Sequence, residues 1–209
     1  MTPQGATRLP AAVRRRALLD AALRVFSSGS YAGATTAEIA REAGVSEPIL
    51  YRHFRSKRDL YLACLDDVWQ RKRALLERTF DELGPAEGWR SLGPASMREM
   101  KVLLPSLWMQ AITEAGEDPV IRRHVRRHMR EVHDFFADVL RRLQEAGVVH
   151  PDRDPDAEAW VFIGGALLQA VADRLGGPLD TGDIEAIRAE RHRWLTGAED
   201  GEREARRAR

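Results

Sequence analysis

Apolar side chains recur along this chain at the spacing of buried helix faces. The first such stripe stands at i, i+4, i+7 and i+8 and consists of Leu18, Ala22, Val25 and Phe26. It predicts a helix over residues 11–28. Alternation of apolar and polar residues over the length of a strand is absent. We therefore predict an all-α protein.

Glycines, prolines and capping residues divide the pattern into further helices. Thr35 and Glu38 have the spacing of a capping box, which begins a short second helix over about 36–43. Gly44 stands where a left-handed C-terminal residue fits, and Ser46 is expected to cap a third short helix that ends near Phe54. The other predicted helices cover 56–83, 96–115, 119–146, 156–175 and, from a cap at Asp183, about 183–195, with a loop over 84–93.

Charge is distributed unevenly over these helices. Residues 1–60 contain ten basic and five acidic residues and carry +5, whereas the remainder contains 23 basic and 27 acidic residues and carries −4. A basic segment beside a mildly acidic one is typical of proteins that bind a polyanion. We predict a basic first domain over 1–60 with a disordered start at about 1–10, a helical domain over 61–196 and a disordered charged tail over 197–209.

Several classes of protein are excluded by what the sequence lacks. It has no run of about 18 apolar residues and no apolar signal-peptide core, so we predict a cytoplasmic protein that does not enter a membrane. Cys64 is the only cysteine, so neither an intrachain disulfide nor a CxxC metal motif can form. Glu-x-x-His, HExxH, P-loop, GxGxxG and GxSxG patterns are missing, which predicts neither an enzyme nor a cofactor.

Residues 35–54 have the pattern of a helix-turn-helix, whose second helix lies in the DNA major groove. If Ile39, Leu50 and Phe54 pack inward, the opposite face of the second helix stays exposed. That face presents Glu47, Pro48, Tyr51 and Arg52. The alternative, a compact helical hairpin without a ligand, leaves this face unexplained.

The exposed face suits the chemistry of nucleic acid. Arg52 can bond a guanine edge, Tyr51 a phosphate or a thymine methyl, and Glu47 a cytosine amine. Hydroxyls and cations at helix ends are positioned to meet phosphates. In this segment they belong to Thr36, Ser46, His53 and Lys57.

The fixed spacing of these residues resembles that of a known family. Thr36, the turn 44–46, the run Leu-Tyr-Arg-His-Phe at 50–54 and Lys57-x-x-Leu60 closely resemble the DNA-binding domain of the tetracycline-repressor (TetR) family, over about residues 12–65. The resemblance implies a three-helix DNA-binding head and a helical body that dimerises and binds a small effector. It also assigns phosphate contacts to Thr36, Ser46, Tyr51, His53 and Lys57, and base contacts to Glu47, Pro48 and Arg52.

In the body, large apolar residues on predicted helices are candidates for an effector pocket. They are Trp69, Trp108, Met109, Ile112, Phe136 and Trp160. Such a lining favours an apolar or amphipathic effector. The alternative for each of them is a place in the ordinary core.

A pair of glycines, Gly164 and Gly165, interrupts a predicted helix, where glycine is about 1 kcal/mol less favourable than alanine. Close approach of another helix would justify them, and the family resemblance implies a dimer interface here. The predicted interface consists of Gly164, Leu168, Val171, Leu175, Ile187 and Trp194. A local kink or packing within the chain is the alternative.

Three side chains, His124, His128 and Glu131, share one helix face at a spacing that can hold zinc. Several arginines at 122–130 would repel a cation, so we predict a solvated basic face and no metal.

Together these features predict a homodimeric, sequence-specific regulator of double-stranded DNA, most simply a repressor that an effector releases from a palindromic operator. The alternative is an architectural or activating DNA-binding protein that answers to no effector.

Overall fold

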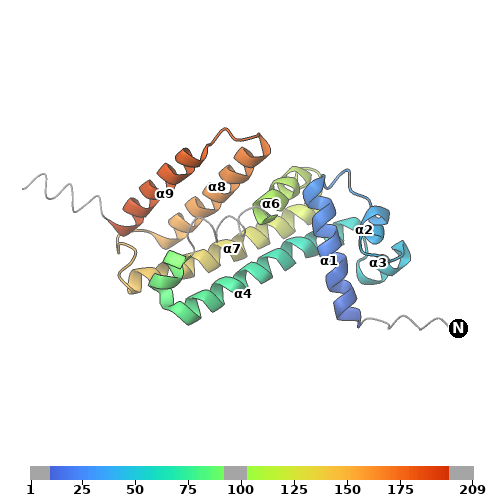
Figure 1. Ribbon diagram of the computed structural model, residues 1–209, viewed down its shortest axis with the longest axis horizontal. Helices are drawn as coiled ribbons and strands as arrows, with labels where there is room; N and C mark the ends of the chain where they lie inside the picture. Colours follow the sequence, from blue (N-terminus) through green and yellow to red (C-terminus); the bar gives the residue numbers. More distant parts are fainter. Residues whose placement is uncertain (1–9, 92–102, 198–209) are drawn as a thin grey trace, which may run out of the picture.

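The computed structural model describes residues 10–91 and 103–197, in which every regular element is a helix. The helices are α1 (Ala11–Ser28), α2 (Thr36–Glu42), α3 (Glu47–His53), α4 (Lys57–Ser91), α6 (Leu103–Glu114), α7 (Pro119–Glu145), α8 (Pro155–Arg174) and α9 (Thr181–Thr196). Figure 1 shows α1–α3, here called the head, at one end of an elongated molecule. The predicted all-α class is confirmed. Apart from Pro10 and Gly197, the predicted disordered ends lie outside the described residues.

The head is held together by the apolar stripe of α1. Leu18 and Phe26 are completely buried and belong to the same cluster as Ile39 of α2 and Leu50 of α3. Helices of seven residues, such as α2 and α3, are not stable alone in water. Their geometry therefore depends on this packing against α1.

The long helix α4 connects the head to the rest of the chain, here called the body. Leu60 and Leu65, near its beginning, are fully buried with the head, and Leu76, further along, belongs to the same core as Ile163 of α8. One hydrophobic core thus runs from the head into the body. The predicted domain boundary at residue 60 falls inside α4 and stays a prediction.

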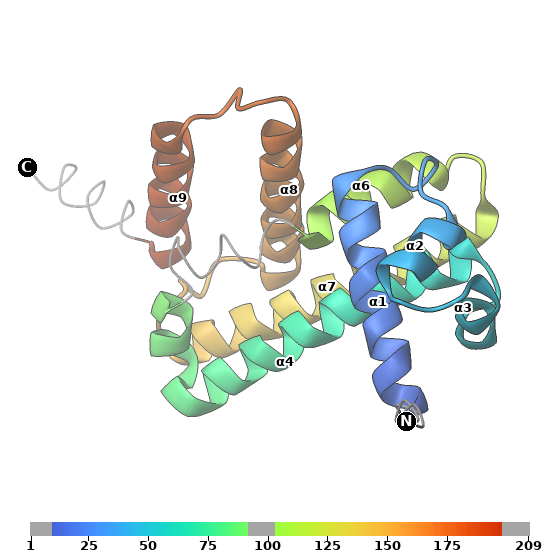
Figure 2. The same cartoon turned by 45° about the vertical axis from the view of Figure 1, so that its right-hand side comes forward.

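The body is a layer of α4 and α7 to which the other helices attach. Trp69 of α4 contacts Phe135 and Phe136 of α7, with ring centroids 5.4 and 6.2 Å apart. Figure 2 shows α6 beside the head, and α8 and α9 as two helices standing out from the α4–α7 layer. Among the described helices, none is long and apolar enough to cross a membrane.

Two helix boundaries differ from the prediction, and a third lies outside the described residues. The expected loop over 84–93 is a kink at Gly84 (φ 75°, ψ 168°), after which helical structure resumes and continues to Ser91. The kink needs a glycine because its φ is positive. The last helix is capped by Asp180, and Asp183, the third residue of that helix, completes the capping box. The first part of the helix predicted over 96–115 lies outside the described residues, and α6 begins at Leu103.

Candidate functional site

The turn between α2 and α3 is fixed by backbone hydrogen bonds. Gly44 has a left-handed φ of 66°, and the amide of Val45 bonds the carbonyl of Ala40 at 2.9 Å. The predicted capping box of α2 consists of two hydrogen bonds. One of them is present among the described residues, where the amide of Glu38 donates to the hydroxyl of Thr35 at 3.1 Å. Ser46 occupies the cap position of α3, but within the described residues its hydroxyl makes no capping bond. These backbone bonds fix the turn that joins α2 to α3.

The outer face of α3 is exposed as the sequence predicts. Leu50 is buried completely, whereas the Tyr51 side chain, one residue further, is 48% exposed. Ser46, Pro48 and Arg52 are exposed on the same short segment. An amphipathic aromatic ring and a guanidinium group are therefore presented to solvent on a rigid helix, which is the arrangement needed to contact DNA edges and phosphates.

Three of the predicted DNA-contacting side chains are joined by hydrogen bonds. The Thr36 hydroxyl donates to the Glu47 carboxylate and lies 3.1 Å from the Tyr51 hydroxyl. Thr36 begins α2, while Glu47 and Tyr51 belong to α3, so the contact links both helices. The half-buried Glu47 carboxylate is held in place before any ligand arrives.

Lys57 is placed differently from the other predicted contacts. Its ammonium group bonds the carbonyls of Tyr31, Ala32 and Ala34 at 2.8, 3.3 and 3.0 Å, and lies 4.6 Å from the centre of the Tyr31 ring. The side chain thus fastens the loop between α1 and α2 to the start of α4. His53, in the last turn of α3, is half-buried. No sequence pattern pairs Lys57 with a loop about 25 residues earlier, so sequence reasoning missed this role.

The head and the first turns of α4 are also joined to α6 and α7 by contacts that the sequence did not suggest. Arg58 pairs with Asp118 at 2.9 Å, and this hydrogen bond is the largest cause that lowers the pKa of Asp118. The Tyr61 hydroxyl donates to the carbonyl of Leu107 at 2.6 Å, and the Gln110 amide to that of Phe26 at 3.1 Å. Burial, as the largest cause, raises the pKa of Tyr61. Because Phe26 lies in α1 and Gln110 in α6, the bond between them links α6 directly to the head.

The predicted pocket residues do not gather around one cavity. Trp69 and Trp108 are buried core residues, and Ile112 is exposed. Met109 is half-buried, and Trp160 lies on another face. Phe136 alone among the six lines a cavity between α4, α7, α8 and α9.

That cavity has a volume of about 690 Å³ and lies between α4, α7, α8 and α9. Its apolar wall includes Leu76, Trp89, Phe136, Phe162 and Ile187. The lining also includes four basic side chains, Lys72, Arg90, Arg188 and Arg191. Glu158 is the one acidic side chain among the lining residues. The cavity is therefore apolar with a basic margin. Sequence reasoning missed Trp89 because it placed that residue in a loop.

The predicted interface residues lie on α8, with Leu175 directly after it, and on α9, two of the four helices that line the cavity. Leu168, Val171, Leu175, Ile187 and Trp194 are all more than a third exposed. No atom of the described chain comes within 4 Å of a Cβ built on Gly164, so packing inside the chain does not explain this glycine. Gly164, Leu168 and Ile187 also border the cavity. Trp194 donates its indole N–H to Glu158 at 2.8 Å.

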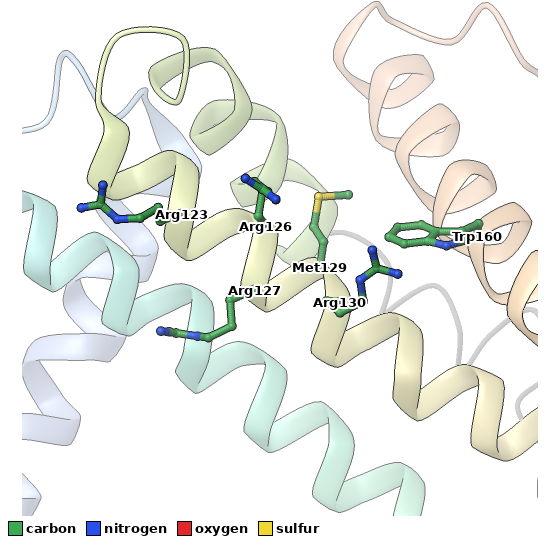
Figure 3. Close-up of a pocket in the computed structure, with 6 residues that line it drawn as sticks. All are labelled: Arg123, Arg126, Arg127, Met129, Arg130 and Trp160. Carbon is green, nitrogen blue, oxygen red and sulfur yellow. The ribbon is translucent and has the colours of Figure 1, made fainter.

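A second groove, of about 450 Å³, follows the surface of α7 and meets Trp160 of α8. Figure 3 shows four arginines along it. The guanidinium of Arg130 lies 5.3 Å from the centre of the Trp160 ring. The His133 ring stacks on the same indole, with ring centroids 4.5 Å apart. This groove is the solvated basic face expected from the sequence. His128, assigned to that face by sequence, is instead completely buried.

Comparison with known proteins agrees with this geometry. The profile of bacterial regulatory proteins of the tetR family matches residues 18–64, which include α2, α3 and the turn between them. The profile of the C-terminal part of BetI-type transcriptional repressors matches residues 96–191. The chain belongs to the TetR family. It is therefore a DNA-binding transcriptional regulator with an N-terminal helix-turn-helix.

Relatives within the TetR family include both repressor-type and activating proteins. The HTH-type transcriptional regulator BetI of Burkholderia lata is 26% identical over 81% of this chain and 87% of its own length. The HTH-type transcriptional activator FasR of Mycolicibacterium smegmatis is 44% identical over 35% of this chain, and the match spans only 42% of FasR. A transcriptional regulator of Saccharomonospora viridis, solved in complex with choline, superposes with a TM-score of 0.57 at 25% identity, over 80% of this chain and 88% of that one.

Proposed function

We propose that this TetR-family protein is a cytoplasmic dimeric repressor that binds a palindromic operator and is released from it by an amphipathic effector. The observation that carries the proposal is the outer face of α3, where Tyr51 and Arg52 are exposed on a helix whose opposite side is buried. A helix of this kind reads base edges in the major groove. Two copies related by a two-fold axis read a palindrome.

The apolar surface of α8 and α9 supports a dimer. Of the twelve large apolar side chains that are exposed among the described residues, seven lie between residues 160 and 194. Apolar patches of this kind are rare on monomers and mark an interface. The open space above Gly164 allows a partner helix to approach closely. A second copy of the chain on this face would cover Leu168 and Val171.

The cavity supports an effector with an apolar body and an acidic group. Aromatic side chains of α4, α7 and α8 supply the apolar wall, and Arg188 of α9 supplies positive charge, whereas the guanidinium of Arg191 is paired with Glu158. A basic margin disfavours a quaternary ammonium ion such as the choline held by the Saccharomonospora viridis regulator. An alkyl carboxylate satisfies both parts of the lining.

The helix α4 supports a mechanism for release. Its second half contributes Leu76 and Trp89 to the cavity, and its first turns bear Arg58 and Tyr61, which bond the body next to the head. An effector that binds better to a shifted α4 therefore favours an altered head position. The two heads of the dimer then no longer match successive major grooves.

The experiment that tests this proposal is selection of binding sites from random duplexes at near-physiological salt. We expect an enriched palindrome, which Tyr51→Ala and Arg52→Ala no longer bind. Decanoate is then expected to release the selected duplex, and choline is not. Enrichment of no sequence would contradict sequence-specific binding and favour an architectural protein.

Activation is the second candidate, favoured by the match to the activator FasR over 35% of this chain. The two functions share the operator and differ in its distance from the promoter. Placing the selected palindrome upstream of, or across, a reporter promoter separates them. A repressor is expected to lower expression of the reporter when the palindrome overlaps the promoter.

A further inference from the structure

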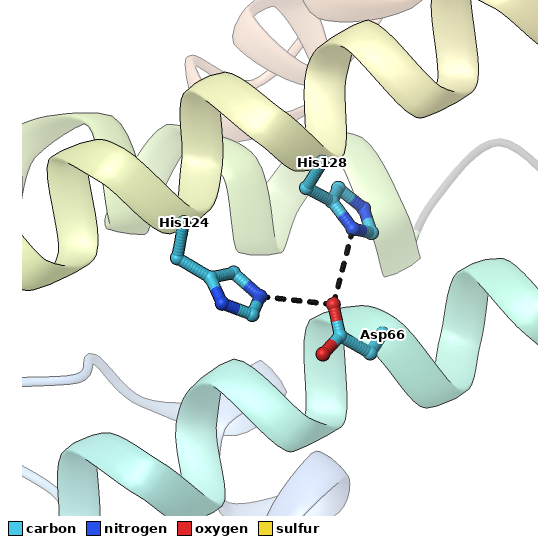
Figure 4. Close-up of side chains that lie close together, drawn as sticks. All are labelled: Asp66, His124 and His128. Atoms are coloured by element: carbon cyan, nitrogen blue, oxygen red, sulfur yellow. Dashed lines mark hydrogen bonds and ion pairs between the residues drawn. The ribbon is translucent and has the colours of Figure 1, made fainter.

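A cluster of three side chains between α4 and α7 has the composition of a metal site. Figure 4 shows the rings of His124 and His128, one turn apart on α7, directed at the carboxylate of Asp66 on α4. The Asp66 Oδ1 atom lies 2.9 Å from His124 Nε2 and 3.4 Å from His128 Nδ1. One donor atom from each residue lies within 4.8 Å of the other two. The carboxylate comes from a helix about 60 residues earlier in the chain.

His128 is the observation that points to a ligand. Its side chain is 0% exposed, and neither ring nitrogen has a hydrogen-bond partner among the described residues. A buried polar group in this state is destabilising unless something satisfies it. Its Nδ1 atom faces Asp66 but does not form a hydrogen bond with it, and the indole of Trp108 occupies another side of the ring, 5.8 Å away. An ion between His128 and Asp66 would satisfy this nitrogen.

We propose that Asp66, His124 and His128 bind a divalent transition-metal ion of the zinc class. Two imidazoles and one carboxylate are ligands that such ions prefer, and three protein ligands leave a position for a solvent molecule. Tetrahedral bonds of about 2.1 Å place ligand atoms about 3.4 Å apart. The observed separations need only small movements of side chains to reach this value.

The charges around the cluster are compatible with a cation. Arg127 donates to the other nitrogen of His124 at 3.1 Å, but its guanidinium also pairs with Glu131 at 3.3 Å. It is more than half exposed and can keep that pair while His124 turns to the ion. Arg126 and Arg130 belong to the groove beside Trp160, away from α4. The Asp66 side chain, 44% exposed, provides a path from solvent.

The proposed site differs from the one that sequence spacing suggests, because its carboxylate ligand is Asp66 and not Glu131. Glu131 stands three residues after His128 on α7, yet its carboxylate pairs with Arg127, whereas Asp66 meets both imidazoles. The bound ion would therefore join α7 to α4, the helix that begins beside the head, whereas a site with Glu131 would lie on α7 alone. Glu131→Gln is the matched control for Asp66→Asn.

The test is a metal titration of the full chain without a histidine tag, stripped with EDTA and then freed of chelator. Zinc binding is measured by calorimetry, and cobalt binding by its visible absorption. We expect one ion per chain and a melting temperature raised by about 5–10 °C at a zinc concentration about 100 times Kd. Asp66→Asn and His128→Asn should weaken binding by more than about 100-fold, and Glu131→Gln should weaken it far less, because it removes the partner of Arg127 and not a ligand of the ion.

Two results would overturn the proposal. One is the absence of stoichiometric binding by the parent chain, and the other is unchanged affinity in Asp66→Asn. Because His128 is buried, its variant is first checked by circular dichroism. If that variant is unfolded, Asp66→Asn decides the question, since it preserves the shape of a partly exposed side chain.

Discussion

The recognition helix α3 and the pair α8–α9 both present unusual surfaces, but of opposite kinds. The face of α3 presents hydroxyl, carboxylate and guanidinium groups, and two of its side chains bond Thr36 of α2. The face of α8 and α9 presents large apolar side chains such as Leu168 and Ile187. The first surface is stable in water and suits a hydrated, charged partner. The second becomes stable only when another apolar surface covers it.

The largest effect is expected where the apolar face is given a charge. Leu168→Arg should produce monomers and weaken binding to the selected palindrome by about 100-fold or more, because the two heads no longer bind as one unit. Sedimentation and fluorescence anisotropy measure the two quantities. Leu75→Arg on α4 is the control, since Leu75 is similarly exposed, 44% against 49%. A Leu168→Arg chain that sediments as a dimer would disprove the assigned interface.

A smaller loss is expected when the face of α3 is altered. Arg52→Ala should weaken operator binding by about 10–100-fold and relax the base preference at one position of each half-site. The dimer should be unaffected, because α3, the helix that bears Arg52, lies at the opposite end of the molecule from α8 and α9 (Figure 1). Anisotropy with single-base variants of the operator measures both effects. Arg78→Ala, an exposed arginine of α4, should bind as the parent chain does.

Lys57→Met distinguishes a structural lysine from a phosphate contact. Loss of the bonds to the carbonyls of the α1–α2 loop should lower the free energy of unfolding by about 1–3 kcal/mol. The slope of log affinity against log salt should stay unchanged. If Lys57 instead contacts a phosphate, as the family resemblance implies, the steepness of that slope decreases by about one. Urea denaturation and a salt series give the two values.

The smallest effect is expected at the turn of the helix-turn-helix. Gly44→Ala should destabilise the chain by about 1–2 kcal/mol because φ is positive, although the added methyl group meets no described atom within 4 Å. Gly44→Asn should be milder, since asparagine tolerates this conformation. Equal effects of the two variants in urea denaturation would show that the left-handed φ is not what matters.

The sequence predicted the head better than the body for a physical reason. In the head, the turn at Gly44, the buried Leu50 and the exposed Tyr51 lie within a few residues of one another, so local spacing determines their arrangement. In the body, the cavity joins Leu76 to Ile187, more than 100 residues apart. Apolar residues at helical spacing predict burial but do not say which buried residue faces a cavity, and Trp69 and Trp108 proved to be core.

Ion pairs and single hydrogen bonds between distant segments were also beyond sequence reasoning. The i, i+4 spacing of His124 and His128 was visible, but Asp66 on another helix was not. The same holds for Arg58 with Asp118 and for Gln110 with the carbonyl of Phe26. Such pairs depend on how whole helices cross, which periodicity does not determine.

The shared hydrogen bonds of Thr36, Glu47 and Tyr51 have an evolutionary consequence. A substitution of one of them leaves the polar groups of the others without their partner, so the effects of changes at these positions should not add. A descendant of this regulator that acquires a new operator through this face must then pass through less fit intermediates, or change two positions together. Divergence is easier at Arg52, whose side chain lies outside this network, and operator preference among close descendants should change there first.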